Sequence, residues 1–439
     1  MDVVMIGAGY VGLVSGACFA EFGAQVVCVD KDESRITALN KGKIPIFEPG
    51  LEGLVGRNVE AGRLSFTADL KSAVSKADLI FIAVGTPTRR GDGHADLKYV
   101  YAAAEELAAH LQGYTVIVNK STVPVGTARE VERIVGKTNP SADFCMASNP
   151  EFLREGSAIG DFMRPDRVVL GVESDKAEAL LRELYRPLNL MEAPILVTNL
   201  ESAELTKYAA NAFLATKISF INEISQLCEK TGADVHAVAK GMGLDGRIGA
   251  KFLHAGPGYG GSCFPKDTVA LIRIAQEYGA SSRIIESVVE VNASQKARMV
   301  AKIRDALGGS EADKTIAVLG LTFKPQTDDM RDAPALAILP ALADHGARIQ
   351  AHDPEGMAEA KPLLPDSVEY MEDVESTLAG ADAVVLMTEW NQYRGLDLKW
   401  VKETMSGDVL VDLRNVFERD MAESAGLKYF CVGRPAGGY

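Results

Sequence analysis

The chain has 439 residues, 47% of them hydrophobic, so it is long enough for two or three domains, each with its own core. Its 46 Lys and Arg residues against 60 Asp and Glu residues give a net charge of −14, which disfavours general attraction to nucleic acid or anionic membranes. The N-terminus lacks signal-peptide features, and no apolar run reaches the roughly 18 residues of a membrane span. We therefore expect a cytoplasmic protein.

The N-terminal part alternates short β-branched runs with helical patterns, which is typical of a parallel sheet covered by helices. Helices are expected between the strands, for example over residues 11–22 and 99–111. The strand candidates are residues 3–6, 25–29, 79–84, 115–119, 144–147 and 168–172.

A glycine motif follows the first predicted strand and opens a helix. Gly7, Gly9 and Gly12 in GAGYVG permit a tight turn, backbone approach to a pyrophosphate and close packing of helix on strand. Asp30 ends the second strand about 20 residues later, where a carboxylate binds ribose hydroxyls and repels a 2′-phosphate. This pattern favours NAD over NADP, although Arg35 lies one helical turn beyond Asp30, on the adenosine side.

One long helix is predicted from Glu201, because the sequence up to Gly232 contains no Pro or Gly and repeats apolar residues at helical spacing. Its length would be roughly 45 Å at about 1.5 Å per residue. A helix of this length needs packing along its sides, so we expect a homo-oligomer. Lys207 and Asn211 are four residues apart and share one face of this helix.

A second alternating region begins at Lys314 and echoes the first, with strand candidates at residues 347–352, 383–387 and 408–413. Only Gly320 stands where a dinucleotide fingerprint would need three glycines, so this region should bind something other than a second NAD. The fold prediction is α/β, with two Rossmann-like parallel-sheet domains joined by a long central helix and a small helical domain. The predicted domains are residues 1–200, 201–300 and 301–439.

The segment from Gly256 to Asp267 is the most informative one in the chain. Its four glycines let the backbone approach a ligand, and Pro265 near the start of a helical pattern places Cys263 by a helix N-terminus. A cysteine in that position readily forms a nucleophilic thiolate. The other five cysteines are expected to be structural, and because no C-x-x-C or H-E-x-x-H pattern occurs, no metal site is expected.

Seven motifs together resemble the UDP-glucose 6-dehydrogenases of the UDP-glucose/GDP-mannose dehydrogenase family. They are GAGYVG, VGTPT, KSTVPVGT, NPEFLREG, ELTKYAANAF, FLHAGPGYGGSCFPKD and GLTFKPQTDDMRDAP. The resemblance covers nearly the whole chain. It implies an NAD-binding Rossmann domain, a central dimerising helix, a C-terminal UDP-sugar domain and reduction of two NAD per UDP-glucose oxidised.

The resemblance also implies the catalytic residues. Cys263 is the nucleophile that forms a thiohemiacetal and then a thioester, while Lys207, Asn211 and Asp267 surround the reacting C6 oxygen. Thr122, Glu151 and Glu155 match positions that hold water or act as acid and base.

The implied ligand-binding residues extend over the three predicted domains. NAD is expected to contact Tyr10, Val11, Thr86, Ser121, Thr122, Glu155 and Arg331, besides the glycines, Asp30 and Arg35. The sugar nucleotide is expected to contact Glu151, Phe152, Leu153, Lys207, Asn211, Arg247, Phe252, Leu253, Tyr259, Gly260, Phe264, Lys324 and Arg414, with Arg247 reaching the substrate of the neighbouring subunit.

Three alternatives remain open at the level of sequence. A GDP-mannose or other nucleotide-sugar 6-dehydrogenase would use the same chemistry. A two-electron hydroxyacid dehydrogenase also joins a Rossmann domain to a long helix but needs no Cys263. An NAD-responsive binding protein would carry an unreactive thiol at that position.

Overall fold

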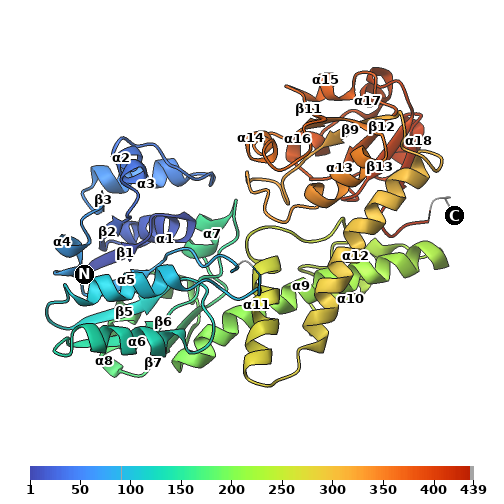
Figure 1. Ribbon diagram of the computed structural model, residues 1–439. Helices are drawn as coiled ribbons and strands as arrows, with labels where there is room; N and C mark the ends of the chain where they lie inside the picture. Colours follow the sequence, from blue (N-terminus) through green and yellow to red (C-terminus); the bar gives the residue numbers. More distant parts are fainter. Residues whose placement is uncertain (90, 436–439) are drawn as a thin grey trace. The chain divides into compact units, whose positions relative to one another are not determined.

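The computed structural model describes residues 1–89 and 91–435. The chain forms two compact units, Met1–Ala210 with Arg273–Ala280, and Asn211–Ile272 with Ser281–Tyr439. Each unit contains one twisted sheet covered by helices, and the long helix α9 (Leu200–Thr231) begins in the first unit and continues in the second (Figure 1). This arrangement confirms the predicted fold class.

The sheet of the first unit has the order β3-β2-β1-β4-β5-β6-β7-β8, and all its pairs are parallel except β6 with β7. Its strands are β1 (Asp2–Ile6), β2 (Gln25–Val29), β3 (Leu64–Thr67), β4 (Leu79–Ile82), β5 (Thr115–Asn119), β6 (Phe144–Ser148), β7 (Val168–Val172) and β8 (Ile195–Thr198). Its helices are α1 (Tyr10–Glu21), α2 (Glu33–Asn40), α3 (Leu51–Glu60), α4 (Leu70–Val74), α5 (Lys98–Ala108), α6 (Thr127–Thr138), α7 (Ala158–Met163), α8 (Asp175–Leu184) and the 3₁₀ helix η1 (Arg186–Met191).

Two hydrophobic cores lie on opposite faces of this sheet. Val3 and Met5 of β1 pack into the core formed with α1, α3 and α7, whereas Val4 and Ile6 pack into the core formed with α4, α5 and α6. Successive side chains of a strand point to opposite faces, so a strand buried on both sides reads as a continuous apolar run. This burial explains why the sequence of β1 has no polar alternation.

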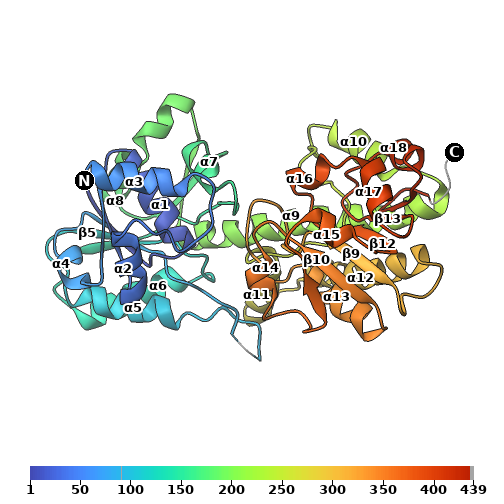
Figure 2. The same cartoon turned by 90° about the horizontal axis from the view of Figure 1, so that it is seen from above.

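The second unit repeats the same strand order, β11-β10-β9-β12-β13-β14. Its strands are β9 (Thr315–Leu319), β10 (Arg348–His352), β11 (Val368–Tyr370), β12 (Ala383–Leu386), β13 (Val409–Asp412) and β14 (Lys428–Cys431). Its helices are α10 (Val235–Gly243), α11 (Phe264–Glu277), α12 (Arg283–Ala306), α13 (Ala335–Asp344), α14 (Met357–Ala360), α15 (Val374–Leu378), α16 (Asn391–Arg394), α17 (Leu398–Thr404) and α18 (Arg419–Ser424), of which α12 and α13 lie side by side (Figures 1 and 2).

Helix α9 has 32 residues, so the predicted uninterrupted helix is confirmed, with a length of about 48 Å at about 1.5 Å per residue. In the second unit it leaves large apolar side chains exposed at a spacing of seven residues. Phe213 is 64% exposed, Phe220 47% and Leu227 55%. Residues seven apart lie on one side of a helix, so these three form a single apolar stripe. Within the described residues, no helix is both long and apolar enough to cross a membrane.

The aromatic core of the first unit provides a test of its packing. Phe19 of α1 lies with its ring centroid 5.0 Å from those of Phe81 and Phe162 and 5.4 Å from that of Tyr185. The substitution Phe19→Ala should lower the free energy of unfolding of this unit by about 3–5 kcal/mol. Urea denaturation measures this change. Tyr99→Ala, at an exposed aromatic residue, is the control. Equal effects of the two substitutions would contradict the packing described here.

Candidate active site

The glycine motif forms a tight turn between β1 and α1. Gly7 has φ +103°, and its N–H donates to the carbonyl of Val29 at 2.7 Å. A Cβ atom at Gly12 would lie 1.8 Å from the Gly7 oxygen, whereas one at Gly9 would meet nothing within 4 Å. Gly9 also precedes α1 without any side-chain cap. The turn therefore leaves open space in front of free helical N–H groups, which suits a pyrophosphate.

Asp30 stands at the end of β2 and links the turn to helix α2. Its Oδ2 accepts a hydrogen bond from the Ala8 N–H at 2.8 Å and pairs with the Arg35 guanidinium at 2.9 Å. Asp32 N–H donates to Oδ1 at 3.0 Å. The structure thus brings Asp30 and Arg35 together beside the glycine turn, and Asp30 fixes the turn as well as offering a carboxylate to a ribose.

Three predicted cofactor residues meet at the carboxyl ends of β4 and β5. The Thr86 hydroxyl donates to the Thr122 carbonyl at 2.9 Å, and the Ser121 hydroxyl donates to the Val84 carbonyl at 2.6 Å. Thr86, Ser121 and Thr122 are all buried. Ligands of open α/β sheets bind outside the carboxyl ends of the strands, so these residues lie at the expected edge.

A carboxylate that sequence reasoning missed, Glu48, joins the glycine motif to a distant loop. It accepts the Tyr10 hydroxyl and the backbone N–H groups of Gly156 at 2.6 Å and Ala158 at 2.8 Å. Burial, the hydrogen bond to Glu48 and the charges of Glu48 and Glu155 raise the pKa of Tyr10 well above its usual value. Tyr10 therefore keeps its proton, and Val11 packs beside it against the core.

Glu151 and Lys207 form a buried ion pair in the first unit. Lys207 Nζ lies 3.0 Å from Glu151 Oε1, and the two side chains are only 3% and 6% exposed. The second carboxylate oxygen of Glu151 accepts the Leu153 N–H at 2.5 Å, and Lys207 Nζ lies 5.3 Å from the centre of the Phe152 ring. The structure thus brings together four residues predicted to touch the sugar.

In the second unit, Cys263 stands immediately before α11, as predicted. The carbonyl of Cys263 accepts the Asp267 N–H at 2.8 Å, which starts the helix, and the Ser262 hydroxyl lies 3.4 Å from the sulfur. Cys263 is partly accessible, whereas Asp267 is 1% exposed. Asp267 accepts Asn211 Nδ2 at 2.6 Å and pairs with Lys266. Cys263, Asn211 and Asp267 therefore belong to one cluster.

The glycine-rich loop before Cys263 is held by helix α12. Asn292 of α12 accepts the Tyr259 N–H at 2.8 Å and donates to the Tyr259 carbonyl at 3.1 Å. A Cβ at Gly258 would lie 2.9 Å from Asn292 Oδ1, and one at Gly260 would lie 2.4 Å from the Asp332 carbonyl oxygen. The glycines are required here by close packing within the protein itself, and Asn292 was not identified from the sequence.

Aromatic residues gather beside the nucleophile. The Phe264 ring centroid lies 6.0 Å from those of Phe252 and Tyr259. Phe252 has φ +66°, an unusual value for a bulky residue, and Leu253 after it is buried. Strained backbone of this kind persists where the surroundings over-determine it, often at functional sites.

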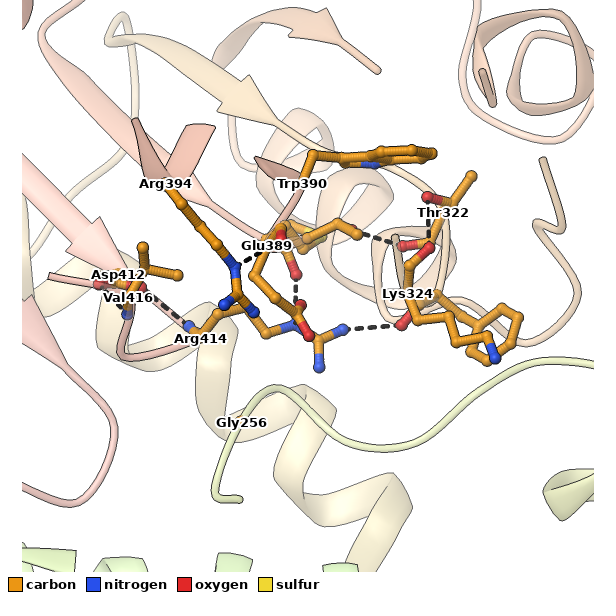
Figure 3. A network of polar contacts seen from close by, with 12 residues as sticks. Gly256, Thr322, Lys324, Glu389, Trp390, Arg394, Asp412, Arg414 and Val416 are labelled. Carbon is orange, nitrogen blue, oxygen red and sulfur yellow. Dashed lines mark hydrogen bonds and ion pairs between the residues drawn. The ribbon is translucent and has the colours of Figure 1, made fainter. Parts of the chain in front are cut away.

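Arg414 is held in place by backbone carbonyls and a carboxylate (Figure 3). Its guanidinium donates to the carbonyls of Met387 at 2.7 Å and Phe323 at 2.8 Å and pairs with Glu389 at 3.1 Å. A Cβ at Gly256 would lie 3.6 Å from Arg414 Nη1, so the arginine adjoins the start of the cysteine loop. Glu389 is a further residue that sequence reasoning missed.

Three further basic residues that were predicted to bind ligands lie in different parts of the second unit. Lys324 lies 5.3 Å above the Phe323 ring, so it is close to the Arg414 network. Arg331 is largely exposed and pairs with Asp329 at 2.7 Å, and the carbonyl of Arg331 accepts the Gly261 N–H. Arg247 is 89% exposed and pairs with Asp245. Its predicted contact with a neighbouring subunit stays a prediction.

In the second sheet, the turn after β9 corresponds to the glycine turn after β1 in the first sheet. Asp353, at the end of β10, turns inward and is fully buried. Its carboxylate accepts the N–H groups of Leu321 at 2.7 Å and Thr322 at 3.1 Å and the Trp390 indole N–H at 3.2 Å. These contacts use the N–H groups of Leu321 and Thr322 in the turn after β9, so these two donors are already hydrogen-bonded within the protein. Among the described residues, no group of His, Cys, Asp and Glu is arranged to hold a metal ion.

Comparisons with known proteins agree over the whole chain. The UDP-glucose/GDP-mannose dehydrogenase family matches through its NAD binding domain at residues 1–189, its central domain at 201–294 and its UDP binding domain at 317–419. A UDP-glucose 6-dehydrogenase of Rhizobium meliloti (strain 1021) is 59% identical over 99% of this chain and 100% of its own length. The UDP-glucose 6-dehydrogenase TuaD of Bacillus subtilis (strain 168) is 52% identical over 99% and 93%.

A solved structure gives the same result. A UDP-glucose dehydrogenase from the hyperthermophilic archaeon Pyrobaculum islandicum superposes with a TM-score of 0.91 at 42% identity, covering 99% of this chain and 98% of that one.

The glycine turn can be tested by a single methyl group. Gly12→Ala should weaken NAD binding at least about tenfold, because the added methyl displaces the Gly7 carbonyl and opens the turn that receives the pyrophosphate. The dissociation constant is measured by calorimetry. In the control Gly136→Ala, at a helical glycine where a Cβ meets nothing within 4 Å, NAD should bind as in the wild type. Unchanged NAD binding by Gly12→Ala would show that the turn is not the cofactor site.

Proposed function

The chain belongs to the UDP-glucose/GDP-mannose dehydrogenase family, and we propose that it oxidises the C6 alcohol of UDP-glucose to the carboxylate of UDP-glucuronate. It is an NAD-dependent oxidoreductase. The observation that carries the proposal is the cluster around Cys263, in which a partly accessible thiol at the start of α11 lies one helical turn before the buried Asp267. A two-electron dehydrogenase has no use for such a nucleophile.

The residues of the first unit fit NAD. The open space at Gly9, the uncapped start of α1 and the carboxylate of Asp30 match the pyrophosphate and the adenosine ribose. NAD, when bound, supplies the hydride acceptor. The further residues that we assign to its binding are Gly7, Tyr10, Val11, Gly12, Arg35, Thr86, Ser121, Thr122, Glu155 and Arg331.

Removal of the C6 hydroxyl proton requires a base and a compensating charge. We assign Glu151 as the base, with Glu155 as its partner in acid and base catalysis. We assign the compensating positive charge to Lys207. The buried ammonium of Lys207, 3.0 Å from the Glu151 carboxylate, stabilises the alkoxide. Because water is excluded from this pair, the electrostatic interactions that aid proton removal and stabilise the alkoxide are both stronger.

Cys263 captures the aldehyde that the first oxidation leaves. Its sulfur adds to C6, and the carbonyl oxygen takes up a proton to give the thiohemiacetal. Oxidation of that carbon yields a thioester. Water, held by Thr122 and directed by Asp267, attacks the thioester, releases the thiol and leaves the carboxylate. Asn211 donates a hydrogen bond to the oxyanion in each addition step.

The sugar nucleotide is assigned to residues of both units. Arg414 and Lys324 supply positive charge for the diphosphate, and the fixed fork of Arg414 suits phosphate oxygens. The remaining assigned contacts come from Phe152, Leu153, Arg247, Phe252, Leu253, Tyr259, Gly260 and Phe264. The division into an NAD-binding domain (1–200), a central domain (201–300) and a UDP-sugar-binding domain (301–439) stays a prediction.

The number of NADH molecules formed per sugar tests the function. With UDP-glucose and NAD we expect two NADH and one carboxylate product per sugar consumed. Cys263→Ser should lower carboxylate formation on the order of 10³-fold or more, because the aldehyde is no longer captured as a thioester. Cys145→Ser, at the other partly buried cysteine, should retain full activity. A yield of one NADH would favour the hydroxyacid-type alternative, and faster turnover of GDP-mannose than of UDP-glucose would favour the other nucleotide-sugar activity.

We also propose a cytoplasmic homodimer that forms along α9. The stripe of Phe213, Phe220 and Leu227 would remain in water in a single chain, and a second copy offers the same stripe in return. Phe220→Glu should raise the dimer dissociation constant on the order of 100-fold, because it places a charge within an apolar interface. Light scattering at several concentrations measures this change. Tyr99→Glu, at another exposed aromatic residue, should leave the mass unchanged, and a monomeric wild type would refute the dimer.

A further inference from the structure

We propose that Lys120 is a positioning residue for the first oxidation, which holds the segment carrying Glu151 and biases the charge of the Glu151–Lys207 pair. This inference rests on the proposed function, because it takes Glu151 and Lys207 to act at the C6 oxygen. Lys120 itself touches neither the substrate nor the cofactor in this proposal.

The side chain of Lys120 reaches into the interior from the end of β5. Its Nζ donates to Asn149 Oδ1 at 2.9 Å and to the Tyr185 hydroxyl at 3.2 Å. The Tyr185 hydroxyl donates to the same Asn149 oxygen at 2.6 Å, and Asn149 Nδ2 donates to the Val169 carbonyl at 2.9 Å. The Asn149 side chain is therefore fixed on both sides, with Lys120 as one of the two donors to its oxygen.

Asn149 is the first residue after β6 and lies two positions before Glu151. Its own N–H donates to the Asn119 carbonyl at 2.9 Å, which continues the pairing of β5 with β6. Pro150 then restricts the backbone between Asn149 and Glu151. Since the Glu151 carboxylate is bound to Lys207 and to the Leu153 N–H, a displacement of Asn149 would move the ion pair.

The electrostatic surroundings of Lys120 differ from those of an ordinary buried cation. Lys120 is 3% exposed, both of its hydrogen-bond acceptors are neutral groups, and its Nζ lies 5.7 and 5.9 Å from the ring centres of Phe162 and Tyr185. Burial, followed by repulsion from Lys207, lowers the pKa of Lys120 to about 7, against the opposing attraction of Glu151. Lys120 therefore gives up its proton more readily than an ordinary lysine.

The titratable groups that face Lys120 come from three parts of the chain. Glu151 follows β6, Lys207 belongs to α9 and Cys18 belongs to α1. Burial raises the pKa of Cys18 to about 12, so this thiol remains neutral. The buried hydroxyl of Tyr185 is also neutral, because burial raises its pKa far above the usual value. Glu151 and Lys207 are therefore the groups that respond to the charge of Lys120.

The sign of that response follows from Coulomb interactions. A positive Lys120 favours negative charge and disfavours further positive charge on the neighbouring Glu151–Lys207 pair. Removal of the positive charge of Lys120 should make the pair as a whole take up a proton more readily. The acid limb of the pH profile for sugar oxidation should then move to higher pH.

Two substitutions separate the geometric role from the charge. Lys120→Met removes both the hydrogen bonds and the charge, whereas Lys120→Gln keeps a donor for Asn149 without the charge. We expect Lys120→Met to lower kcat about tenfold or more, and Lys120→Gln to recover part of that loss. Both should shift the acid limb of kcat upward by about half a pH unit or more, with the dissociation constant for NAD changed less than about threefold.

The measurements are kcat over pH 5.5–9, NAD binding by calorimetry and thermal unfolding of the full chain. Lys302→Met is the matched control, because Lys302 is another largely buried lysine but pairs with Glu229 in the second unit. It should leave the pH profile unchanged. A folded Lys120→Met variant with wild-type kcat and pH profile would overturn the inference, as would a loss of kcat that Lys120→Gln does not relieve and that leaves the profile unshifted.

If Lys120→Met fails to fold, Tyr185→Phe decides the question, because it removes only the hydroxyl that shares Asn149 with Lys120. We expect kcat to fall about two- to fivefold with the acid limb in place, because the charge of Lys120 remains, and a wild-type kcat would overturn the inference. The outcome is separable from that of the proposed function. A wild type that does not form two NADH per UDP-glucose refutes the function, whereas one that does and tolerates the Lys120 variants refutes only the positioning role.

Discussion

A buried pair of opposite charges, Glu151 and Lys207, constrains how the first unit folds. Glu151 and Lys207 are almost completely buried and 3.0 Å apart, and either charge alone would destabilise the interior by several kcal/mol. The pair therefore requires that the start of α9 and the loop after β6 fold against the same edge of the sheet. Because each charge compensates the other, this contact also holds together the two groups to which we assign the base and the cation of the proton transfer.

The two sheets share the order of six strands but differ in detail at the turns after β1 and β9. In the first unit glycines keep this turn open, and Asp30 stands at its rim. In the second unit Asp353 accepts the backbone N–H groups of the corresponding turn and is completely buried. The same strand order is thus compatible with a turn kept open by glycines and with a turn whose N–H groups are bound by a buried aspartate. Which sheet binds a dinucleotide is determined by a few side chains at one edge.

The features that the sequence predicted are those with local causes. The Gly7–Gly12 turn, the continuous helix α9 and the position of Cys263 before α11 follow from steric or periodic rules within a short segment. Glu48 was missed because its partners at Gly156 and Ala158 lie more than 100 residues away along the chain. Asn292 and Glu389 also act through contacts with residues distant in the chain. The edge strands β11 and β14 include exposed residues and lack the continuous apolar run of the central strands.

The fixed guanidinium of Arg414 has a thermodynamic consequence. A free arginine side chain gives up about 2 kcal/mol of rotamer freedom when it is immobilised. Two backbone carbonyls and Glu389 already restrict Arg414, so this entropy is lost when the chain folds and is not lost again when an anion arrives. The association of a diphosphate at this position should therefore carry a smaller entropic penalty than it would with a flexible surface arginine.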